Sequence, residues 1–593
     1  MSKKAKTAAI AFSDANRLGQ VVSVDTSRVL VSVDNAKLLP RAAVGSLVAI
    51  QGITAQEFLI GMTERVTRQL REQLAAPDPL SPGELESEVV PDDAIRVVLL
   101  GTYRAVEGKQ RNRFKRGADS FPQIDRECFL IEGPNLQAFM GLLGEGVAEK
   151  ERLEIGRFVL DPDAVAIVNG DRFFQRHASI LGSTGSGKSW CVSTILEKAH
   201  SRPHANLIVF DMHGEYVSLA DPKGELDRDD LEPIATHFRI AGPGDLDSPP
   251  ANALFLPYWL LNREEMLSMI VDRSENNAPN QASRFTTHVK DLKAARLTQE
   301  GKAAVAATFT VDSPIPFDID ELIAKFEYDD SERLFDKSKA GRDGDWAKKL
   351  TRMIARLKSK QEDRRYGFMF KPPKQAQAYD WLASQIAAML DSQKDHYGIK
   401  IIDFSEVPSD VLPIVTGLLA RLLYDVQFWM RPEERTPFVF VCDEAHLYLP
   451  VREDSSSVEK QALATFERIA KEGRKYGVSL LVVSQRPSDV SRTILSQCNN
   501  FVILRLTNDQ DQNVVRRLMP DSLAGVLDGL PLLDTGEALL LGDAVLLPTR
   551  VKLSTPAIEP LSRTRDSWQE WGDHGASDKA IREAVETLRK QAR

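Results

Sequence analysis

The stretch from Gly182 to Ser189 reads GSTGSGKS and fits the pattern G-x-x-x-x-G-K-[ST] at every fixed position. The apolar run before it, residues 178–181, predicts a short buried strand, and residues 190–200 carry apolar side chains at helical spacing. A loop between such a strand and helix gathers backbone N–H groups and the positive end of the helix around one anion. The motif therefore predicts an α/β fold organised around a nucleotide phosphate, with an ordinary glycine-rich turn as the alternative.

The positions of this phosphate loop predict individual contacts with a nucleotide. We expect the Lys188 side chain to reach the β- and γ-phosphates of ATP, and the Ser189 hydroxyl to be a ligand of Mg²⁺. Trp190, the first residue after the motif, completes the predicted ATP-binding set. That set is Gly182, Ser183, Thr184, Gly185, Ser186, Gly187, Lys188, Ser189 and Trp190.

Two later apolar runs, residues 437–442 and 478–483, also lead into polar residues. Ligand-binding groups collect at the carboxyl ends of parallel strands. We therefore expect Asp443 to hold the Mg²⁺ shell, Glu444 to polarise the attacking water, and Gln485 to bond the γ-phosphate or that water. Acid pairs also occur at solvated strand ends, and only the order of this pair after a phosphate loop favours catalysis.

Composition narrows the class of protein. A chain of 593 residues predicts two to four domains. Lys plus Arg total 76 against 85 for Asp plus Glu, and the net charge of −9 argues against a uniformly basic surface, so any DNA site must be local. The four cysteines lack metal-ligand spacing and predict neither zinc nor disulfides. With no secretory leader and no apolar run of about 20 residues, we expect a cytoplasmic protein without a membrane segment.

The pattern along the chain predicts several domains. Short alternating runs at the start indicate a small β-barrel, interrupted at residues 75–93 by an acidic, proline-rich, exposed excursion. A long amphipathic helical stretch later in the chain indicates an inserted subdomain; its basic run could meet phosphates, but a solvated helix face is the preferred interpretation. The predicted parts are a barrel (1–165), an ATPase core in two pieces (166–257 and 397–553), a helical insertion (258–396) and a C-terminal arm (554–593).

The order of these motifs resembles the HerA family of hexameric DNA-translocating ATPases, which are related to FtsK. The resemblance covers nearly the whole chain, from the barrel to a C-terminal segment with Trp568 and Trp571. Its motifs are LGSTGSGKS (181–189), FD with HGEY (210–216), DFS with VP (403–408), DEAH (443–446), EGRKYG (472–477) and SQRP (484–487).

This resemblance implies a RecA-like core with a HerA-type barrel and a helical insertion, assembled as a homohexamer with ATP sites between subunits. Arg474 matches the family's arginine finger, which acts in trans on the transferred phosphate, and Arg176 matches a second interfacial arginine. From the residues alone, either arginine is equally a surface residue. Asp211 and Glu215 also match; Glu215 would assist water positioning, and a helix cap is its alternative.

The resemblance also implies an ATP-driven translocase or helicase that moves double-stranded DNA through the ring. A partner would dock through the N-terminal barrel: a NurA-like or other nuclease in DNA end processing, or a sirtuin-type NAD-degrading effector in bacterial antiviral defence. The alternative is a ring-shaped scaffold and ATP-gated regulator of such an effector, with little translocation of its own. The chain carries no nuclease motif. A protein that works together with a second protein is therefore favoured over an autonomous helicase.

Overall fold

The chain forms two compact units. The computed structural model describes residues 10–25, 28–54, 56–74, 87–105, 112–118, 120–145, 147–334, 342–391, 398–454, 457–520, 523–562, 567–573, 575 and 577–590. The first unit comprises Met1–Lys198, Gln485–Ser488 and Cys498–Pro556. The second unit comprises Ala199–Ser484, Asp489–Gln497 and Ala557–Arg593.

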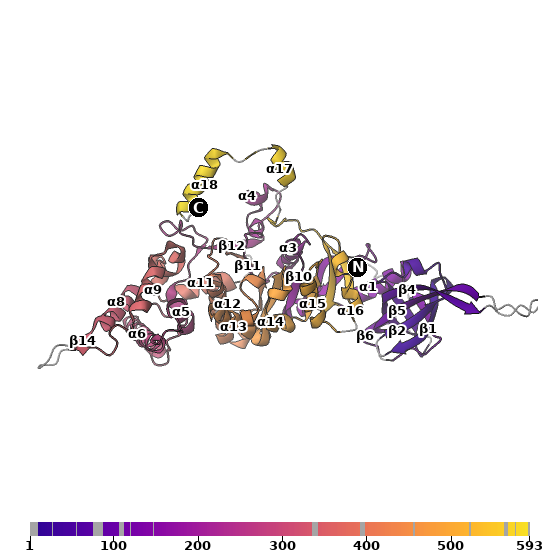
Figure 1. The fold of residues 1–593 in the computed structure, drawn as a ribbon, viewed down its shortest axis with the longest axis horizontal. Coiled ribbons are helices and arrows are strands. Elements are labelled where there is room, and N and C mark those ends of the chain that lie inside the picture. Colours follow the sequence, from indigo (N-terminus) through magenta and orange to yellow (C-terminus); the bar gives the residue numbers. More distant parts are fainter. Residues whose placement is uncertain are drawn as a thin grey trace, which may run out of the picture. The chain divides into compact units, whose positions relative to one another are not determined.

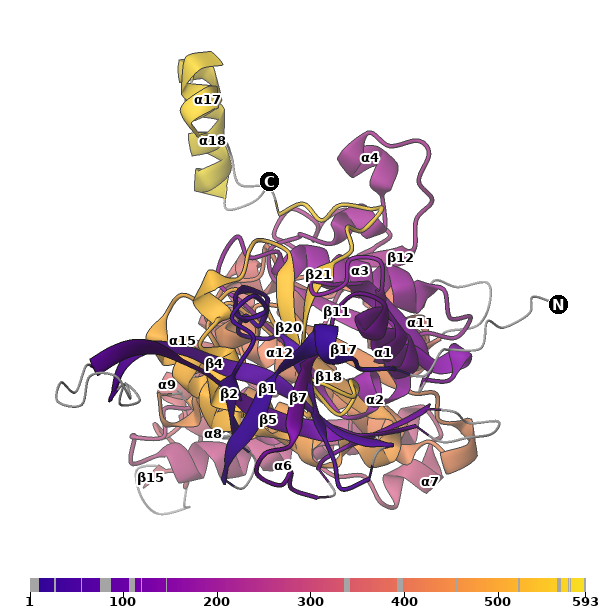
Figure 2. The ribbon, with the colours of Figure 1, turned by 90° about the vertical axis from the view of Figure 1, so that its right-hand side faces the viewer.

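The first unit begins with a 7-stranded antiparallel sheet that the pairing of β2 with β5 closes into a barrel. Its strands alternate buried and exposed residues, as in β2, where Val29, Val31 and Val33 point into the core. The predicted N-terminal β-barrel is therefore confirmed, and Figures 1 and 2 show its strands in indigo to purple. They are β1 (Arg17–Asp25), β2 (Arg28–Val33), β3 (Leu47–Gln51), β4 (Glu57–Leu74), β5 (Ser87–Ala105), β6 (Asn112–Arg116) and β7 (Glu127–Leu130).

The last part of the excursion expected at residues 75–93 is a strand. Residues 87–93 belong to β5, which pairs with β4 as far as Leu74 and Ser87. Pro91 is tolerated in this strand because it lies beyond residues 94–98, where β5 also pairs with β2. The rest of the expected excursion, residues 75–86, lies outside the described part of the chain.

The first unit also contains a second sheet, which carries the phosphate loop. Its strands, in spatial order, are β10 (Ala178–Leu181), β19 (Asn500–Ile503), β20 (Glu537–Gly542), β21 (Thr549–Leu553), β8 (Arg152–Phe158) and β9 (Val165–Asn169). β10 is fully buried and leads through the loop into α3 (Lys188–His200), as the sequence predicts. Although β8 lies in the segment assigned to the barrel, it pairs with β21. The unit's helices are α1 (Gly133–Glu145), α2 (Gly170–Gln175), α15 (Asp509–Leu518) and α16 (Ala524–Leu527).

The second unit is built on a parallel sheet. In spatial order its strands are β13 (Ala253–Leu254), β12 (Ala235–Ile240), β16 (Ile399–Asp403), β11 (Leu207–Asp211), β17 (Phe438–Cys442) and β18 (Val478–Ser484). Every residue of β11, β17 and β18 is buried, which explains why these strands read as continuous apolar runs. The helices that follow the sheet strands are α4 (Pro222–Leu226), α12 (Leu412–Trp429), α13 (Ser457–Glu472) and α14 (Arg492–Gln497).

The stretch expected to be a helical insertion consists mainly of helices. They are α5 (Arg263–Ile270), α6 (Ala278–Gln299), α7 (Ala303–Ala306), α8 (Ile319–Ser331), α9 (Thr351–Glu362), α10 (Gly367–Phe370) and α11 (Trp381–Leu390), with a short hairpin of β14 (Arg333–Leu334) and β15 (Arg342–Asp343). Met353 and Leu357 on α9 are fully buried, whereas Arg356 and Lys358 form ion pairs with Glu275 and Glu327. These pairs fit the solvated-face interpretation of the basic run.

The C-terminal segment contains α17 (Ser567–Asp573) and α18 (Asp578–Lys590). Trp568 and Trp571 of α17, both part of the family resemblance, are 88% and 77% exposed. Within the described ranges, no helix combines the length and apolar character required to cross a bilayer.

Candidate functional site

The phosphate loop makes a tight turn before α3. Gly185 and Gly187 have φ angles of +71° and +99°, in the left-handed region that glycine adopts without steric cost. A Cβ atom on Gly187 would lie 3.4 Å from the backbone of Gly536, so the loop and the β20 side of the sheet approach closely. Between them, the Gly536 N–H donates a hydrogen bond of 3.0 Å to the Ser186 carbonyl. The backbone conformation of the turn therefore favours glycine at position 187, whereas the contact with Gly536 alone would leave room for a Cβ atom.

Lys188 and Ser189 occupy the first positions of α3. The first N–H groups of a helix have no partner within the helix and attract anions. The Lys188 side chain is buried in the unit, where an ammonium group acts on a phosphate with little screening by water. A backbone cradle, an ammonium group and a hydroxyl at one helix N-terminus fit a nucleotide phosphate with Mg²⁺.

Gln485 lies against this loop in the first unit. The Thr184 hydroxyl donates a hydrogen bond of 2.6 Å to Gln485 Oε1. The segment that carries Gln485 is fixed in turn, because the Ser488 N–H donates to Asp511 Oδ1 at 3.0 Å. The structure thus places the predicted γ-phosphate residue beside the predicted phosphate-binding residues; its role in catalysis stays a prediction.

The acid pair follows β17 in the second unit. Asp443 and Glu444 are only 3% and 8% exposed. Glu444 has a φ of +41°, a left-handed conformation that costs a non-glycine residue on the order of 1–3 kcal/mol. Backbone strain of this kind collects at functional sites, where the surrounding structure enforces a side-chain direction. The conformation supports a specific task for the Glu444 carboxylate.

His446 is a residue of this site to which the sequence assigned no role. Its Nδ1 atom lies 3.3 Å from Glu444 Oε2 and 3.5 Å from the hydroxyl of Ser484, the last residue of β18. The imidazole thus joins the carboxylate to the strand that directly precedes Gln485 in the chain. The DEAH motif contains His446, but no spacing rule indicates that the turn after β17 brings it back to Glu444.

Asp211, at the end of β11, is fully buried and organises the loop that carries Glu215. Its carboxylate accepts hydrogen bonds from the N–H groups of His213, Glu215 and Tyr216 at 3.3, 3.0 and 2.8 Å. Burial raises the pKa of Asp211 to about 7, and nearby Asp403 adds to the shift. For Asp403 itself, burial acts in the same direction, but contacts from His237 and the Ser405 N–H bring its pKa below the ordinary value.

Replacing Asp211 by asparagine should change how stability depends on pH. Because the folded-state pKa is raised from 3.8 to about 7, the wild-type side chain contributes stability below about pH 4 and loses that contribution as pH rises through 7. Relative to Asp211→Asn, the wild type should thus lose up to about 3 kcal/mol between pH 5 and pH 8. Urea unfolding at both pH values measures the difference; a constant difference would contradict the raised pKa. Asp403→Asn is the control: because the Asp403 pKa is lowered from its ordinary value, its contribution changes only below about pH 4, and its difference from the wild type should stay constant between pH 5 and pH 8.

Arg474 and Glu444 lie at opposite edges of the second unit's sheet. Arg474 belongs to the turn that enters β18, whereas Glu444 follows the end of β17, and the two strands are parallel with Phe438 opposite Val478. Five residues of strand separate the edges, about 16 Å. Arg474 is exposed, and among the described residues no hydrogen bond or ion pair reaches its guanidinium group. Arg474 is therefore too far from the acid pair of its own sheet to act on the same phosphate. This separation is consistent with a finger that acts in trans.

Arg176 forms an ion pair within its own chain. It is the C-cap of α2, and its guanidinium group forms a short ion pair with the Asp543 carboxylate. It lies before β10, while the phosphate loop follows the other end of that strand. The pair with Asp543 accounts for Arg176 structurally, and its interfacial role stays a prediction.

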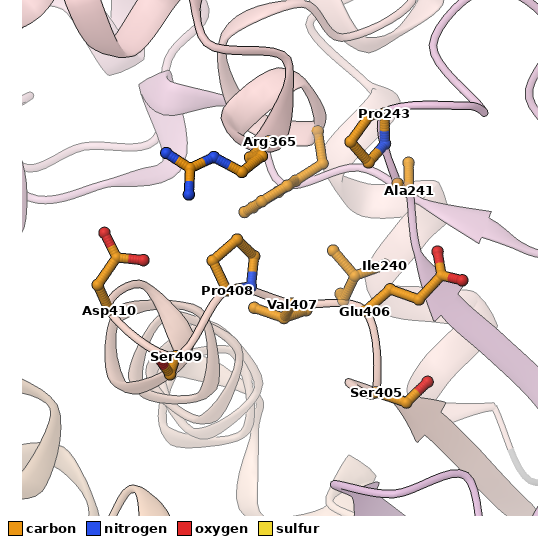
Figure 3. A pocket seen from close by; sticks show the side chains of 12 residues that line it. Ile240, Ala241, Pro243, Arg365, Ser405, Glu406, Val407, Pro408, Ser409 and Asp410 are labelled. Atoms are coloured by element: carbon orange, nitrogen blue, oxygen red, sulfur yellow. The ribbon is translucent and has the colours of Figure 1, made fainter. Parts of the chain in front are cut away.

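A pocket of about 360 Å³ opens beyond the carboxyl ends of β12 and β16. Its floor includes Phe368 and Pro408, and Figure 3 shows Arg365 and Asp410 on one side of Pro408 with Glu406 on the other. None of the predicted site residues lines this pocket. In addition, no cluster of three or more His, Cys, Asp or Glu residues suited to a metal ion occurs in the described ranges.

The residues that carry the phosphate loop are similar to a known family. Residues 153–423 match the family model described as the central domain of helicase HerA. This part of the chain is similar to the HerA central domain. The DNA double-strand break repair helicase HerA of Pyrococcus furiosus is 26% identical over 436 residues, which cover 68% of this chain and 69% of that protein. HerA of Saccharolobus solfataricus is 26% identical over 413 residues, with 68% and 69% covered.

The solved structures that match share less sequence with this chain. VirB4 of Thermoanaerobacter pseudethanolicus matches with a TM-score of 0.45 and 15% identity, covering 69% of this chain and 98% of that one. The plasmid coupling protein TrwB in complex with ADP and Mg²⁺ matches with a TM-score of 0.42 and 16% identity, covering 72% and 95%. With its phosphate loop and the similarity of residues 153–423 to the HerA central domain, the chain is a P-loop ATPase with distant similarity to archaeal HerA.

Proposed function

We propose that this chain is an ATP-driven translocase of double-stranded DNA. The observation that carries the proposal is the HerA-type central domain with a fully formed phosphate loop at the start of α3. The relatives that match over about two thirds of their length are named DNA double-strand break repair helicases. An ATPase core of this type converts nucleotide hydrolysis into movement along DNA.

The residues take the following roles in the proposal. Lys188 binds the β- and γ-phosphates, Glu444 accepts a proton from the attacking water, and Gln485 orients the γ-phosphate or that water. Mg²⁺, held by Ser189 and Asp443, would neutralise charge on the phosphates when bound. Thr184 supports the role of Gln485, because their hydrogen bond ties the amide to the phosphate loop.

The proposed assembly is a homohexameric ring with ATP bound between subunits. Its support is the position of Arg474, exposed and at the sheet edge opposite the acid pair of the same chain. An arginine so placed stabilises charge on a phosphate held by the adjacent subunit. Arg176 would lie at the same boundary.

A second protein completes the proposed machine. The described barrel strands contain no metal-binding acid or histidine cluster, so the barrel is better suited to docking than to chemistry. We propose that a nuclease or an NAD-degrading effector binds there, in DNA end processing or antiviral defence in the cytoplasm. A stable contact would bury on the order of 1,000 Å² and be multiplied by the ring.

A salt series of DNA-stimulated ATP hydrolysis tests the translocase. With duplex DNA, turnover above the basal rate should fall steeply between about 50 and 200 mM salt, because each phosphate contact releases counterions. The basal rate, measured in the same buffers, controls for salt effects on hydrolysis itself, and Lys188→Ala gives the background. If ATPase is indifferent to DNA and salt but depends on the partner, the chain is a scaffold and not a translocase.

A further inference from the structure

An exposed tryptophan lies close to the proposed finger. Trp429, the last residue of α12, is 81% exposed. Its ring centroid lies 5.3 Å from that of Phe428, which lies 5.0 Å from that of Tyr476. Tyr476 and Arg474 belong to the same short turn, η11 (Gly473–Tyr476). The aromatic chain therefore leads from Trp429 directly to the segment that carries the finger.

Two arginines stack on these rings and complete a cluster, here called the Trp429 platform. The Arg435 guanidinium lies 5.0 Å from the Tyr476 centroid, and Arg468 lies 5.0 Å from that of Tyr424 and 5.7 Å from that of Phe428. Cation–π contacts of this kind hold planar groups in place. The platform comprises Tyr424, Phe428, Trp429, Arg435, Arg468 and Tyr476.

Hydrogen bonds make the platform rigid. Gln427 Nε2 donates to the carbonyls of Thr436 and Tyr476 at 3.0 and 2.9 Å, which ties the end of α12 to η11. Arg435 caps the same helix end by donating to the carbonyls of Gln427, Phe428 and Met430 at 3.1, 3.0 and 3.1 Å. The backbone segments that carry Trp429 and Arg474 are thus tied to each other, and a fixed backbone lowers the entropic cost of binding.

We propose that the Trp429 platform is the docking surface by which the finger edge of one subunit binds a second copy of this chain. The inference rests on the proposed function, because Arg474 completes an ATP site only on another copy. A largely exposed tryptophan, linked through Phe428 and Tyr476 to the turn of that arginine, has the composition of an interface hot spot, and burying it removes roughly 150–250 Å² of ring from water.

Charge favours a protein over a nucleic acid as the occupant. Arg468 lies 3.7 Å from both Asp425 and Glu472, and Arg431 lies 3.5 Å from Glu434. Because carboxylates neutralise Arg468 and Arg431, these two arginines contribute little to phosphate binding. They suit the polar rim that surrounds a tryptophan at a protein interface.

Assembly of the full-length protein tests the proposal. Sedimentation velocity across a dilution series, with and without a non-hydrolysable ATP analogue, should show that Trp429→Ala needs at least tenfold more protein to assemble. Trp429→Phe should lie between this variant and the wild type. Tyr328→Ala is the matched control, since Tyr328 is 68% exposed on α8 and lies outside the platform. Specific ATPase activity of Trp429→Ala should fall on dilution and recover at high concentration.

The outcomes separate this inference from the proposed function. If the wild type hydrolyses ATP and Trp429→Ala assembles at wild-type concentrations, the docking surface is wrong. Unchanged assembly with weakened DNA binding would also overturn it, and would make the platform a nucleic-acid surface. If the wild type shows no DNA-dependent ATPase but assembly still depends on Trp429, the interface stands and the translocase proposal fails. Circular dichroism and thermal unfolding verify that each variant is folded.

Discussion

Glu444→Gln is expected to leave ATP bound and to reduce its hydrolysis by about 100-fold or more. The substitution keeps the size of the side chain and removes only the carboxylate that accepts the proton of the attacking water. Lys188→Ala should instead abolish nucleotide binding, because the ammonium group at the start of α3 is lost. Fluorescent-nucleotide binding and steady-state phosphate release, measured on both variants, separate the two kinds of loss.

The control for this pair is Asp221→Asn, which alters a helix N-cap of α4 away from the acid pair and should hydrolyse ATP at the wild-type rate. If Glu444→Gln retained turnover within tenfold of the wild type, the barrier would have changed by less than about 1.4 kcal/mol. Glu444 would then not be the group that activates water.

Arg474→Ala should remove most turnover, about 10³-fold, while the assembly stays intact. The arginine lies at the sheet edge opposite its own acid pair, so in the proposal it acts on the ATP site of a neighbouring subunit. Mixing Arg474→Ala with Lys188→Ala subunits should therefore restore part of the activity. At some boundaries, a subunit with a working phosphate loop then meets a subunit with a working finger.

Subunit exchange has to be shown in the same mixture, for example by energy transfer between labelled subunits. Lys475→Ala is a suitable control, because Lys475 is exposed next to Arg474 and has no assigned role. If the subunits exchange freely but the mixture is as inactive as either variant alone, the result would count against action in trans. If Arg474→Ala fails to assemble, the result would indicate that the arginine stabilises the contact between subunits and has no demonstrated role in catalysis.

The sequence predicted the strands near the phosphate loop accurately. The expected strands at residues 178–181 and 478–483 correspond to β10 (Ala178–Leu181) and β18 (Val478–Ser484). These strands are readable because parallel strands covered on both faces need unbroken apolar runs. The phosphate loop is readable because its glycines and its lysine have few substitutes at those backbone angles.

Features made by contacts between distant residues could not be read in this way. The hydrogen bond from Thr184 to Gln485 and the contact of His446 with Ser484 depend on which strand ends meet, and no local pattern records that. Likewise, the prolines of residues 75–93 gave no sign that residues 87–93 form a strand, because proline disfavours strands in general, whereas Pro91 lies where β5 lacks the β2 pairing. Local propensity was overridden by the tertiary position.

The separation of Arg474 from Glu444 has a genetic consequence. If each chain supplies a phosphate loop to one boundary and a finger to another, an allele with Lys188→Ala disables one reaction centre per defective chain. An allele that also carries Arg474→Ala disables two. In a cell that also expresses the wild-type allele, the doubly substituted chain should therefore have the stronger dominant-negative effect. Expressed alone, both alleles should lack ATPase activity.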